Sequence, residues 1–295
     1  MTALSIAIPF FRDDPSDLIK ALGRLRLADK TSLYIADDGT GDAALTERIE
    51  MALAAFPGDG HLITLASNQG RSAARNALIK AAQGAFILFL DADMAPDNPD
   101  FLERWLGLIA EHNPPIAFGG FTTAQVSKSR ANALTYYLAR TTDCPALAVR
   151  EARGPLAVAT SNLLVRRDVI AEVPFDAGFS GWGWEDVDWA MRASAKFSIH
   201  HVDIPATHLG LDDAETLLRK YRGAGPNLRR LLDGHPDAGS LHGVRVARAL
   251  GKFPHALFRP IWAFLARDPF GLTPMPLRGL SAKLWRASWA AEAIA

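Results

Sequence analysis

The sequence has a single cysteine, no excess of either charge and no long apolar run, and each absence excludes a class of protein. Cys144 alone can form neither an internal disulfide nor a cysteine metal cluster, which fits a reducing compartment. A formal net charge of zero gives no general attraction for nucleic acid. No uncharged apolar run reaches the roughly 18 to 20 residues that cross a bilayer. Because the chain also starts without the pattern of a signal peptide, we expect a cytoplasmic protein.

Charge is nevertheless unevenly spread along the chain. Residues 243–295 hold eight basic residues and two acids, a net charge of +6, so the residues before them carry a net −6. The same segment contains Trp262, Trp285 and Trp289. Basic residues mixed with tryptophan on helical segments are typical of a helix that lies on a membrane, here on its inner face, without crossing it. The alternative is that these helices pack on the rest of the protein, with the tryptophans in the core.

The order of apolar runs and helical patterns predicts an α/β protein with a helical appendage. Over about the first ninety residues, short apolar runs alternate with helical patterns, which predicts a mostly parallel sheet with helices on both faces. Beyond Asp212 the pattern is mostly helical, with breaks at 223–226 and 234–236. The predicted strands are 4–9, 33–36, 61–65, 85–90, 116–121, 161–165 and 197–202, and the predicted helices before Asp212 are 15–25, 42–53, 72–82, 98–112 and 185–195.

Three of the predicted strands end in conspicuous residues, in Pro9-Phe10-Phe11-Arg12, Asp37-Asp38-Gly39 and Asp91-Ala92-Asp93. In a parallel sheet these ends share one edge, and ligands of open α/β sheets bind beyond that edge. Two carboxylates directly after a buried strand are costly unless something neutralises them. Mg²⁺ or Mn²⁺ does so through one or two carboxylates and substrate phosphates. Asp91 and Asp93 therefore predict a metal site, with a loop of solvated acids as the alternative.

The segment from Gly181 to Asp188, GWGWEDVD, is the second conspicuous feature. Trp182 and Trp184 offer flat apolar surfaces of the kind on which sugar rings stack. Glu185 and Asp186 fall at the start of a predicted helix, where the helix dipole favours the ionised carboxylate, and such a carboxylate can act as a general base. The alternative is a helix start with acids as caps and tryptophans in the core.

Two single residues carry weaker signals. Arg71 opens a predicted helix, and its guanidinium suits a diphosphate, although simple surface exposure explains it equally well. His208 follows a strand and a proline turn, and a lone histidine is more often a satisfied polar residue than a metal ligand.

Five stretches together resemble family 2 glycosyltransferases of the GT-A fold. In order, over about residues 4–210, they are SIAIPFFRD, IADDGTGD, NQGRSAARN, FLDADM and FSGWGWEDVDWAMR. The GWGWED segment also resembles a C-terminal galactosyltransferase-type motif. Ala36 and Thr40 depart mildly from the Val and Ser that the family commonly shows around its acids and glycine.

This resemblance implies a role for each candidate residue. It places Asp186 as the catalytic base and Glu185 as its acceptor-binding partner, and it makes His208 a further metal ligand. Trp182 and Trp184, from the stacking argument, complete the set. On the donor side it implies that Pro9 and Phe11 line the nucleobase pocket, that Asp38 with Asp37 nearby contacts the base or ribose, that Arg71 lies near the nucleotide, and that Asp91 and Asp93 contact the ribose and the diphosphate-bound metal.

The implied activity is an inverting, Mn²⁺- or Mg²⁺-dependent transfer of a hexose from a nucleoside diphosphate sugar, most often a UDP-sugar, to a hydroxyl of a glycan or lipid-linked acceptor. The expected catalytic domain is 1–212, with a nucleotide-sugar half at 1–97 and an acceptor half at 98–212, followed by a helical extension at 213–295. Two other classes stay open. One is a non-catalytic sugar-nucleotide or glycan-binding module, and the other is a phosphotransferase with Asp91 as nucleophile, disfavoured because no Thr or Gly follows Asp93.

Overall fold

The computed structural model describes residues 3–295, and the chain divides into two compact units. The first unit runs to Val126 and also contains Cys144–Ser180 and Trp189–Gly210. The second consists of Ser127–Asp143, Gly181–Asp188 and Leu211–Ala295. The second unit therefore takes in two short segments from the middle of the chain as well as the C-terminal region. The domain limits at residues 97 and 212 stay a prediction.

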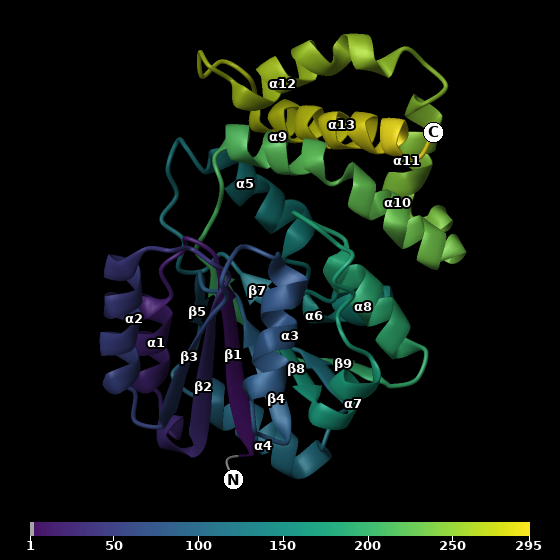
Figure 1. Cartoon of the computed structure of the whole chain (residues 1–295). Coiled ribbons are helices and arrows are strands. Elements are labelled where there is room, and N and C mark those ends of the chain that lie inside the picture. The colour runs from purple at the N-terminus through teal and green to yellow at the C-terminus, as the bar shows by residue number, and fades with distance from the viewer. Residues whose placement is uncertain (1–2) are drawn as a thin grey trace. The chain divides into compact units, whose positions relative to one another are not determined.

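A seven-stranded sheet in the order β3-β2-β1-β4-β8-β6-β9 forms the centre of the first unit (Figure 1). The first four strands along the chain pair in parallel, as their apolar sequences predict. β8 lies antiparallel between β4 and β6, so the sheet is mixed but mostly parallel. The strands are β1 (Leu4–Phe10), β2 (Thr31–Asp37), β3 (Asp59–Thr64), β4 (Phe86–Leu90), β6 (Ile116–Phe118), β8 (Asn162–Arg166) and β9 (Ile199–His201).

Helices cover both faces of this sheet, which confirms the predicted layers. Successive residues of β1 point to opposite faces, so Ile6 and Ile8 pack with α1, α2 and α4 while Ala7 packs with α3, α7 and α8. All three of these side chains are fully buried. The helices of the first unit are α1 (Ser16–Gly23), α2 (Ala43–Ala54), α3 (Arg71–Ala81), α4 (Phe101–His112), α6 (Leu147–Arg153), α7 (Arg167–Glu172) and most of α8 (Glu185–Ser194), with short turns of 3-10 helix at Ala28–Lys30 and Gly154–Ala157.

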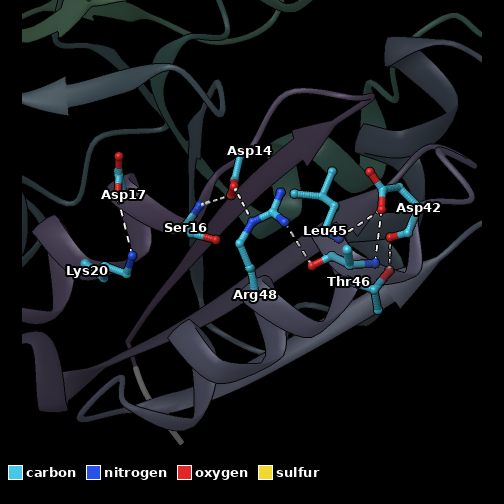
Figure 2. Close-up of polar contacts among 9 residues, drawn as sticks. Asp14, Ser16, Asp17, Lys20, Asp42, Leu45, Thr46 and Arg48 are labelled. Atoms are coloured by element: carbon cyan, nitrogen blue, oxygen red, sulfur yellow. Dashed lines mark hydrogen bonds and ion pairs between the residues drawn. The ribbon is translucent and has the colours of Figure 1, made fainter.

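Aspartate side chains accept backbone N–H groups close to the starts of the first two helices (Figure 2). Asp14 accepts the backbone N–H of Ser16 at 2.9 Å, just ahead of α1. Asp42 accepts backbone N–H groups in the first turn of α2, including that of Leu45 at 3.1 Å. Arg48 of α2 donates to Asp14 at 3.0 Å and so joins the starts of the two helices.

A second, three-stranded sheet in the order β5-β10-β7 corrects the sequence prediction in two places. The predicted strand 116–121 breaks at Gly119-Gly120, because Gly120 has φ +80° and a Cβ there would lie 2.6 Å from the Arg150 guanidinium carbon. His208 is the last residue of β10 rather than part of a following loop. The strands are β5 (Met94–Pro96), β7 (Phe121–Thr122) and β10 (Ala206–His208).

A partly buried polar network joins the strands of this small sheet. Asp97 accepts hydrogen bonds from the hydroxyls of Thr122 and Thr207, both at 2.6 Å, and from the side chain of Gln125 at 3.0 Å. Thr207 is fully buried and directly precedes His208. The network therefore holds the strand that carries His208 against its neighbours.

The second unit is a group of helices around its own apolar core. Leu134, Leu138, Leu217 and Leu218 pack there with small residues of α12 and α13. The predicted breaks are confirmed, since α9 ends at Gly223 and a new turn follows Gly234. No helix among residues 3–295 is long and apolar enough to cross a membrane. The helices are α5 (Ala133–Leu138), α9 (Ala214–Gly223), α10 (Gly225–Gly234), α11 (His242–Leu250), α12 (Arg259–Arg267) and α13 (Met275–Ala293), with a π turn at Ala139–Asp143 and 3-10 turns at Pro236–Ser240 and His255–Phe258.

Candidate functional site

The candidate residues that follow β1, β2 and β4 lie along one edge of the central sheet. These strands are neighbours in the order β2-β1-β4 and run parallel, so their carboxyl ends meet as predicted. The backbone N–H of Asp38 donates to the carbonyl of Phe10 at 2.9 Å, and that of Arg12 donates to the Thr40 hydroxyl at 2.9 Å. The first two strand ends are therefore tied to each other by hydrogen bonds.

Asp37 and Asp38 are buried acids whose oxygens accept backbone N–H groups. Asp37 accepts from Thr40 at 2.8 Å and shapes its own turn. Asp38 accepts from Gln69 and from Gly70, each at 2.8 Å. This carboxylate thus fixes the loop from which α3 begins, and its expected contact with a base or ribose stays a prediction.

Pro9 and Phe11 are half-buried at the same edge. The guanidinium of Arg12, which sequence reasoning did not single out, lies 4.9 Å from the centre of the Phe11 ring. Arg71 is exposed at the start of α3, as the surface alternative predicted. Its positive charge nevertheless contributes to lowering the pKa of Asp93. Arg71 therefore interacts electrostatically with the Asp93 carboxyl group.

Asp93 and His208, which are distant in sequence, lie together. Nε2 of His208 is 3.1 Å from Oδ2 of Asp93, and each side chain is 31% exposed. The antiparallel register of β5 and β10 sets His208 opposite Met94, and the Leu209 N–H donates to the Asp93 carbonyl at 2.9 Å. A Cβ at Gly210 would come within 1.9 Å of the same Asp93 oxygen. Backbone pairing therefore holds this pair in place, and the lack of a side chain at Gly210 leaves room for the Asp93 carboxylate.

The two side chains shift each other's titration in opposite directions. Burial opposes the charged form of His208, but the hydrogen bond and negative charge of Asp93 outweigh it and raise the histidine pKa. Burial likewise opposes the charged form of Asp93, but the hydrogen bond and charge of His208 prevail and lower the carboxyl pKa. Both shifts therefore widen the pH range over which a charged Asp93 faces a protonated His208.

Asp91 has a different partner, Arg75, that sequence reasoning missed. Arg75 is 1% exposed, its Nη2 is 3.6 Å from Oδ1 of Asp91, and its guanidinium lies 5.5 Å from the centre of the Phe175 ring. The sequence signal for Arg75 is its spacing from Arg71 in NQGRSAARN. The two arginines are one turn apart and therefore share a face of α3. Asp91 is thus neutralised from within the protein.

The residues at this edge fit a divalent cation that is shared with a ligand. Among residues 3–295, no three His, Cys, Asp or Glu side chains converge as a complete metal site. Asp93 and His208 supply one oxygen and one nitrogen donor, a set that suits Mn²⁺. Magnesium and manganese sites that use few protein ligands take the others from phosphate oxygens and water. The pair therefore suits a cation that arrives with a diphosphate.

The segment Gly181–Asp188 belongs to the second unit, and its tryptophans pack against other side chains. Trp182 is half-buried with its ring 5.8 Å from that of Tyr221, as the core alternative predicted. Burial raises the pKa of Tyr221 to about 12, so this phenol stays protonated. Glu185 is buried and Asp186 is half-buried in the first turn of α8.

A family model described as glycosyl transferase family 2 matches residues 5–173, more than half of the chain. The chain belongs to this family. Of the three classes left open by the sequence, this family membership supports a glycosyltransferase. The assignment of the GWGWED segment to a second motif stays a prediction.

One curated relative of this glycosyltransferase is glycosyltransferase AglE of Haloferax volcanii. The two are 27% identical over 201 residues, which is 65% of this chain and 61% of AglE. The chain therefore spans less than two thirds of the length of this relative.

Solved structures of glycosyltransferases share the fold at low identity. The mannosyltransferase PcManGT of Pyrobaculum calidifontis, in complex with GDP-Man and Mn²⁺, aligns with a TM-score of 0.63 and 14% identity over 99% of this chain and 86% of that one. TarS 1-349 of S. aureus aligns with a TM-score of 0.58 and 14% identity over 99% of this chain and 90% of that one. The enzyme has the GT-A fold that the resemblance implied.

The Asp93–His208 pair predicts how His208 titrates in enzyme freed of metal with EDTA. NMR of the imidazole should give a pKa above the ordinary value of 6.5. In Asp93→Asn the pKa of His208 should fall, because the carboxylate that raises it is lost while the burial that lowers it remains. The pair should therefore stabilise the fold most below pH 6.5, and this contribution should fade as the pH rises through the His208 pKa. An unchanged pKa in Asp93→Asn would contradict the pairing.

Proposed function

We propose that this glycosyltransferase is an inverting enzyme that transfers a hexose from a nucleoside diphosphate sugar to a hydroxyl of a glycan or lipid-linked acceptor. The observation that carries the proposal is the Asp93–His208 pair beyond β4, at the same edge of the sheet as the buried acids at the end of β2. Structural neighbours support the donor class, since PcManGT was solved with GDP-Man and TarS with UDP and with UDP-GlcNAc. We favour a UDP-sugar as the donor.

On the donor side, Asp93 and His208 would hold Mn²⁺ or Mg²⁺, and Arg71 would face the diphosphate. The cation would supply positive charge to offset the negative charge of the departing diphosphate. Asp91, held by Arg75, would accept hydrogen bonds from the ribose. Asp38 would keep the start of α3 in place, and Pro9 and Phe11 would line the space for the base. These roles follow the family resemblance and the contacts of the first unit.

On the acceptor side, Asp186 would act as general base. It would take the proton of the acceptor hydroxyl while that oxygen forms its bond to the anomeric carbon. The bond from this carbon to the diphosphate oxygen would break, and the nucleoside diphosphate would leave with the electron pair. A single displacement of this kind inverts the anomeric configuration. Glu185 would contact the acceptor, and Trp182 and Trp184 would offer it apolar surface.

A membrane contact through residues 243–295 belongs to the proposal, but the structure changes which residues would make it. The tryptophans are held inside the second unit. Trp285 donates to the carbonyl of Leu218 at 2.9 Å, and Arg259 lies 3.6 Å from the centre of the Trp289 ring. Neither tryptophan is fully exposed. Trp285 and Trp289 are therefore occupied by contacts within the second unit, and the choice between the two expectations stays a prediction.

Exposed apolar residues gather instead in the segment 253–280. Nine of the fourteen large apolar side chains that are exposed among residues 3–295 lie in it. Phe264 and Phe270 contact each other edge to face at 6.1 Å, which joins α12 to the loop that follows. Apolar surface of this kind marks a contact with a partner or a membrane. The nine residues are Phe253, Leu257, Phe258, Ile261, Phe264, Phe270, Leu272, Leu277 and Leu280.

The charge around this segment favours an anionic lipid surface. Asp268 is the only acid between residues 243 and 280, it is 9% exposed, and it lies 3.7 Å from the Arg278 guanidinium. Within residues 243–280 there is thus no exposed carboxylate, and the exposed Glu292 and Glu215 are paired with Arg259 and Arg267 of α12. The exposed basic residues directly before the segment 253–280 are Arg245, Arg248 and Lys252.

The assignment of the base predicts a separation of chemistry from binding. Asp186→Asn keeps the shape of the side chain but removes the base, so turnover should fall roughly 100-fold or more while nucleotide affinity persists. Release of nucleoside diphosphate from UDP-GlcNAc and GDP-mannose measures turnover, and calorimetry with UDP and GDP measures affinity. Near wild-type turnover in Asp186→Asn would rule out Asp186 as the base.

The lipid proposal predicts that wild-type enzyme sediments with anionic phosphatidylglycerol vesicles at low salt and less at high salt. The double variant Phe270→Ser, Leu272→Ser should stay in solution, because it removes the most exposed apolar side chains of the loop. Met51→Ser is the matched control, since Met51 is 68% exposed on α2, and it should sediment like the wild type. Wild-type enzyme that ignores anionic vesicles at low salt would end the lipid proposal.

A further inference from the structure

The backbone of the segment Gly181–Asp188 is strained where it leads into α8. Gly181, Gly183 and Trp184 all have positive φ, at +73°, +96° and +76°. Glycine adopts this region freely, but a tryptophan there is strained. Such a conformation persists only when the surroundings enforce it. The next two residues are Glu185 and Asp186, so whatever enforces the turn also sets their position.

Arg286 of α13 is at the centre of those surroundings. Its guanidinium carbon lies 5.9 Å from the ring centre of Trp182, 5.2 Å from that of Trp184 and 5.1 Å from that of Tyr221. A planar cation between aromatic faces attracts each of them through the ring quadrupole. Arg286 is half-buried, which weakens the competition of water for its charge. One side chain of the last helix thus joins both tryptophans of the segment.

Two further contacts hold the same segment from the helices that follow it. Asn227 of α10 is 3% exposed, and its side-chain amide donates to the carbonyl of Gly183 at 2.9 Å. His235, which follows α10, lies with Nε2 3.0 Å from Oδ1 of Asp188, and Asp188 is itself buried. The segment is therefore held at its tryptophans, at its backbone and at the first turn of α8.

We propose that Arg286 is a positioning residue for catalysis, which fixes the turn at Trp182 and Trp184 and thereby sets the carboxylates of Glu185 and Asp186. The assignment rests on the proposed function, in which Asp186 is the base. It gives the C-terminal helices a part in the chemistry, although they lie outside residues 5–173 that match the family model. Arg286 itself touches no reacting atom in this account.

Hydrogen exchange tests the positioning without any substrate. In Arg286→Met, amide exchange in residues 181–188 should rise roughly tenfold, because the cation–π contacts that hold the turn are lost. Arg286→Lys, which keeps the charge but loses the planar group, should lie between Met and wild type. Arg222→Met is the matched control, since Arg222 lies 4.8 Å from the centre of the Trp289 ring in the same unit. The control should leave exchange in 181–188 at the wild-type rate.

Kinetics then separates a positioning role from a merely structural one. Nucleoside diphosphate release from UDP-GlcNAc or GDP-mannose should fall roughly tenfold in Arg286→Met, while UDP affinity by calorimetry stays within about twofold of wild type. Equal exchange in Arg286→Met and Arg222→Met would overturn the proposal, and so would a loss of UDP affinity as large as the loss of turnover. A failure of the base assignment itself would show differently, as full turnover in Asp186→Asn.

Discussion

Carboxylates at the edge of the central sheet need positive partners, and the way each is satisfied organises the candidate site. An acid next to buried strands is costly to ionise unless hydrogen bonds or opposite charge offset the loss of water. Asp38 is satisfied by two backbone N–H groups and Asp91 by the buried Arg75. Asp93 is paired with His208. Unlike a backbone N–H or a guanidinium, a protonated imidazole loses its positive charge by releasing a proton. In the proposed function, a divalent cation would take the place of that proton.

In the proposed function, this difference would give each acid a separate task. Asp38 fixes the loop from which α3 begins with Arg71. Asp91 faces Arg75 with one oxygen, and its other oxygen would accept from a polar ligand. Asp93 and His208 depend on the register between β5 and β10, and the polar network of Asp97 maintains that register. The proposed donor side would thus combine one edge of the central sheet with the small second sheet.

Much of this was predictable from sequence, because long apolar strands and their ends carry strong patterns. The parallel pairing of β1 to β4, the helices on both faces and the gathering of strand ends were all expected and are confirmed. The small sheet of β5, β7 and β10 was not predicted, since its pairing depends on partners far along the chain. For the same reason the sequence could rate His208 only as a lone histidine.

Side-chain partners were the other limit of sequence reasoning. Arg75 looked like an ordinary helix residue, although it stands one turn after Arg71 and is almost fully buried. The tryptophans of the GWGWED segment were expected either to face sugar or to fill the core, and no pattern indicated that Arg286, about a hundred residues later, contacts both. Local propensity describes elements well, whereas contacts between distant segments depend on the tertiary fold.

The central claim, that Asp93 and His208 bind a nucleoside diphosphate through a divalent cation, is tested most directly by calorimetry. UDP and GDP are titrated into wild-type enzyme and His208→Gln, in EDTA and in Mn²⁺. The account predicts that Mn²⁺ strengthens nucleotide binding to the wild type by roughly tenfold or more, and that most of this gain is lost in His208→Gln. Equal affinities in EDTA and in Mn²⁺ for the wild type would contradict it.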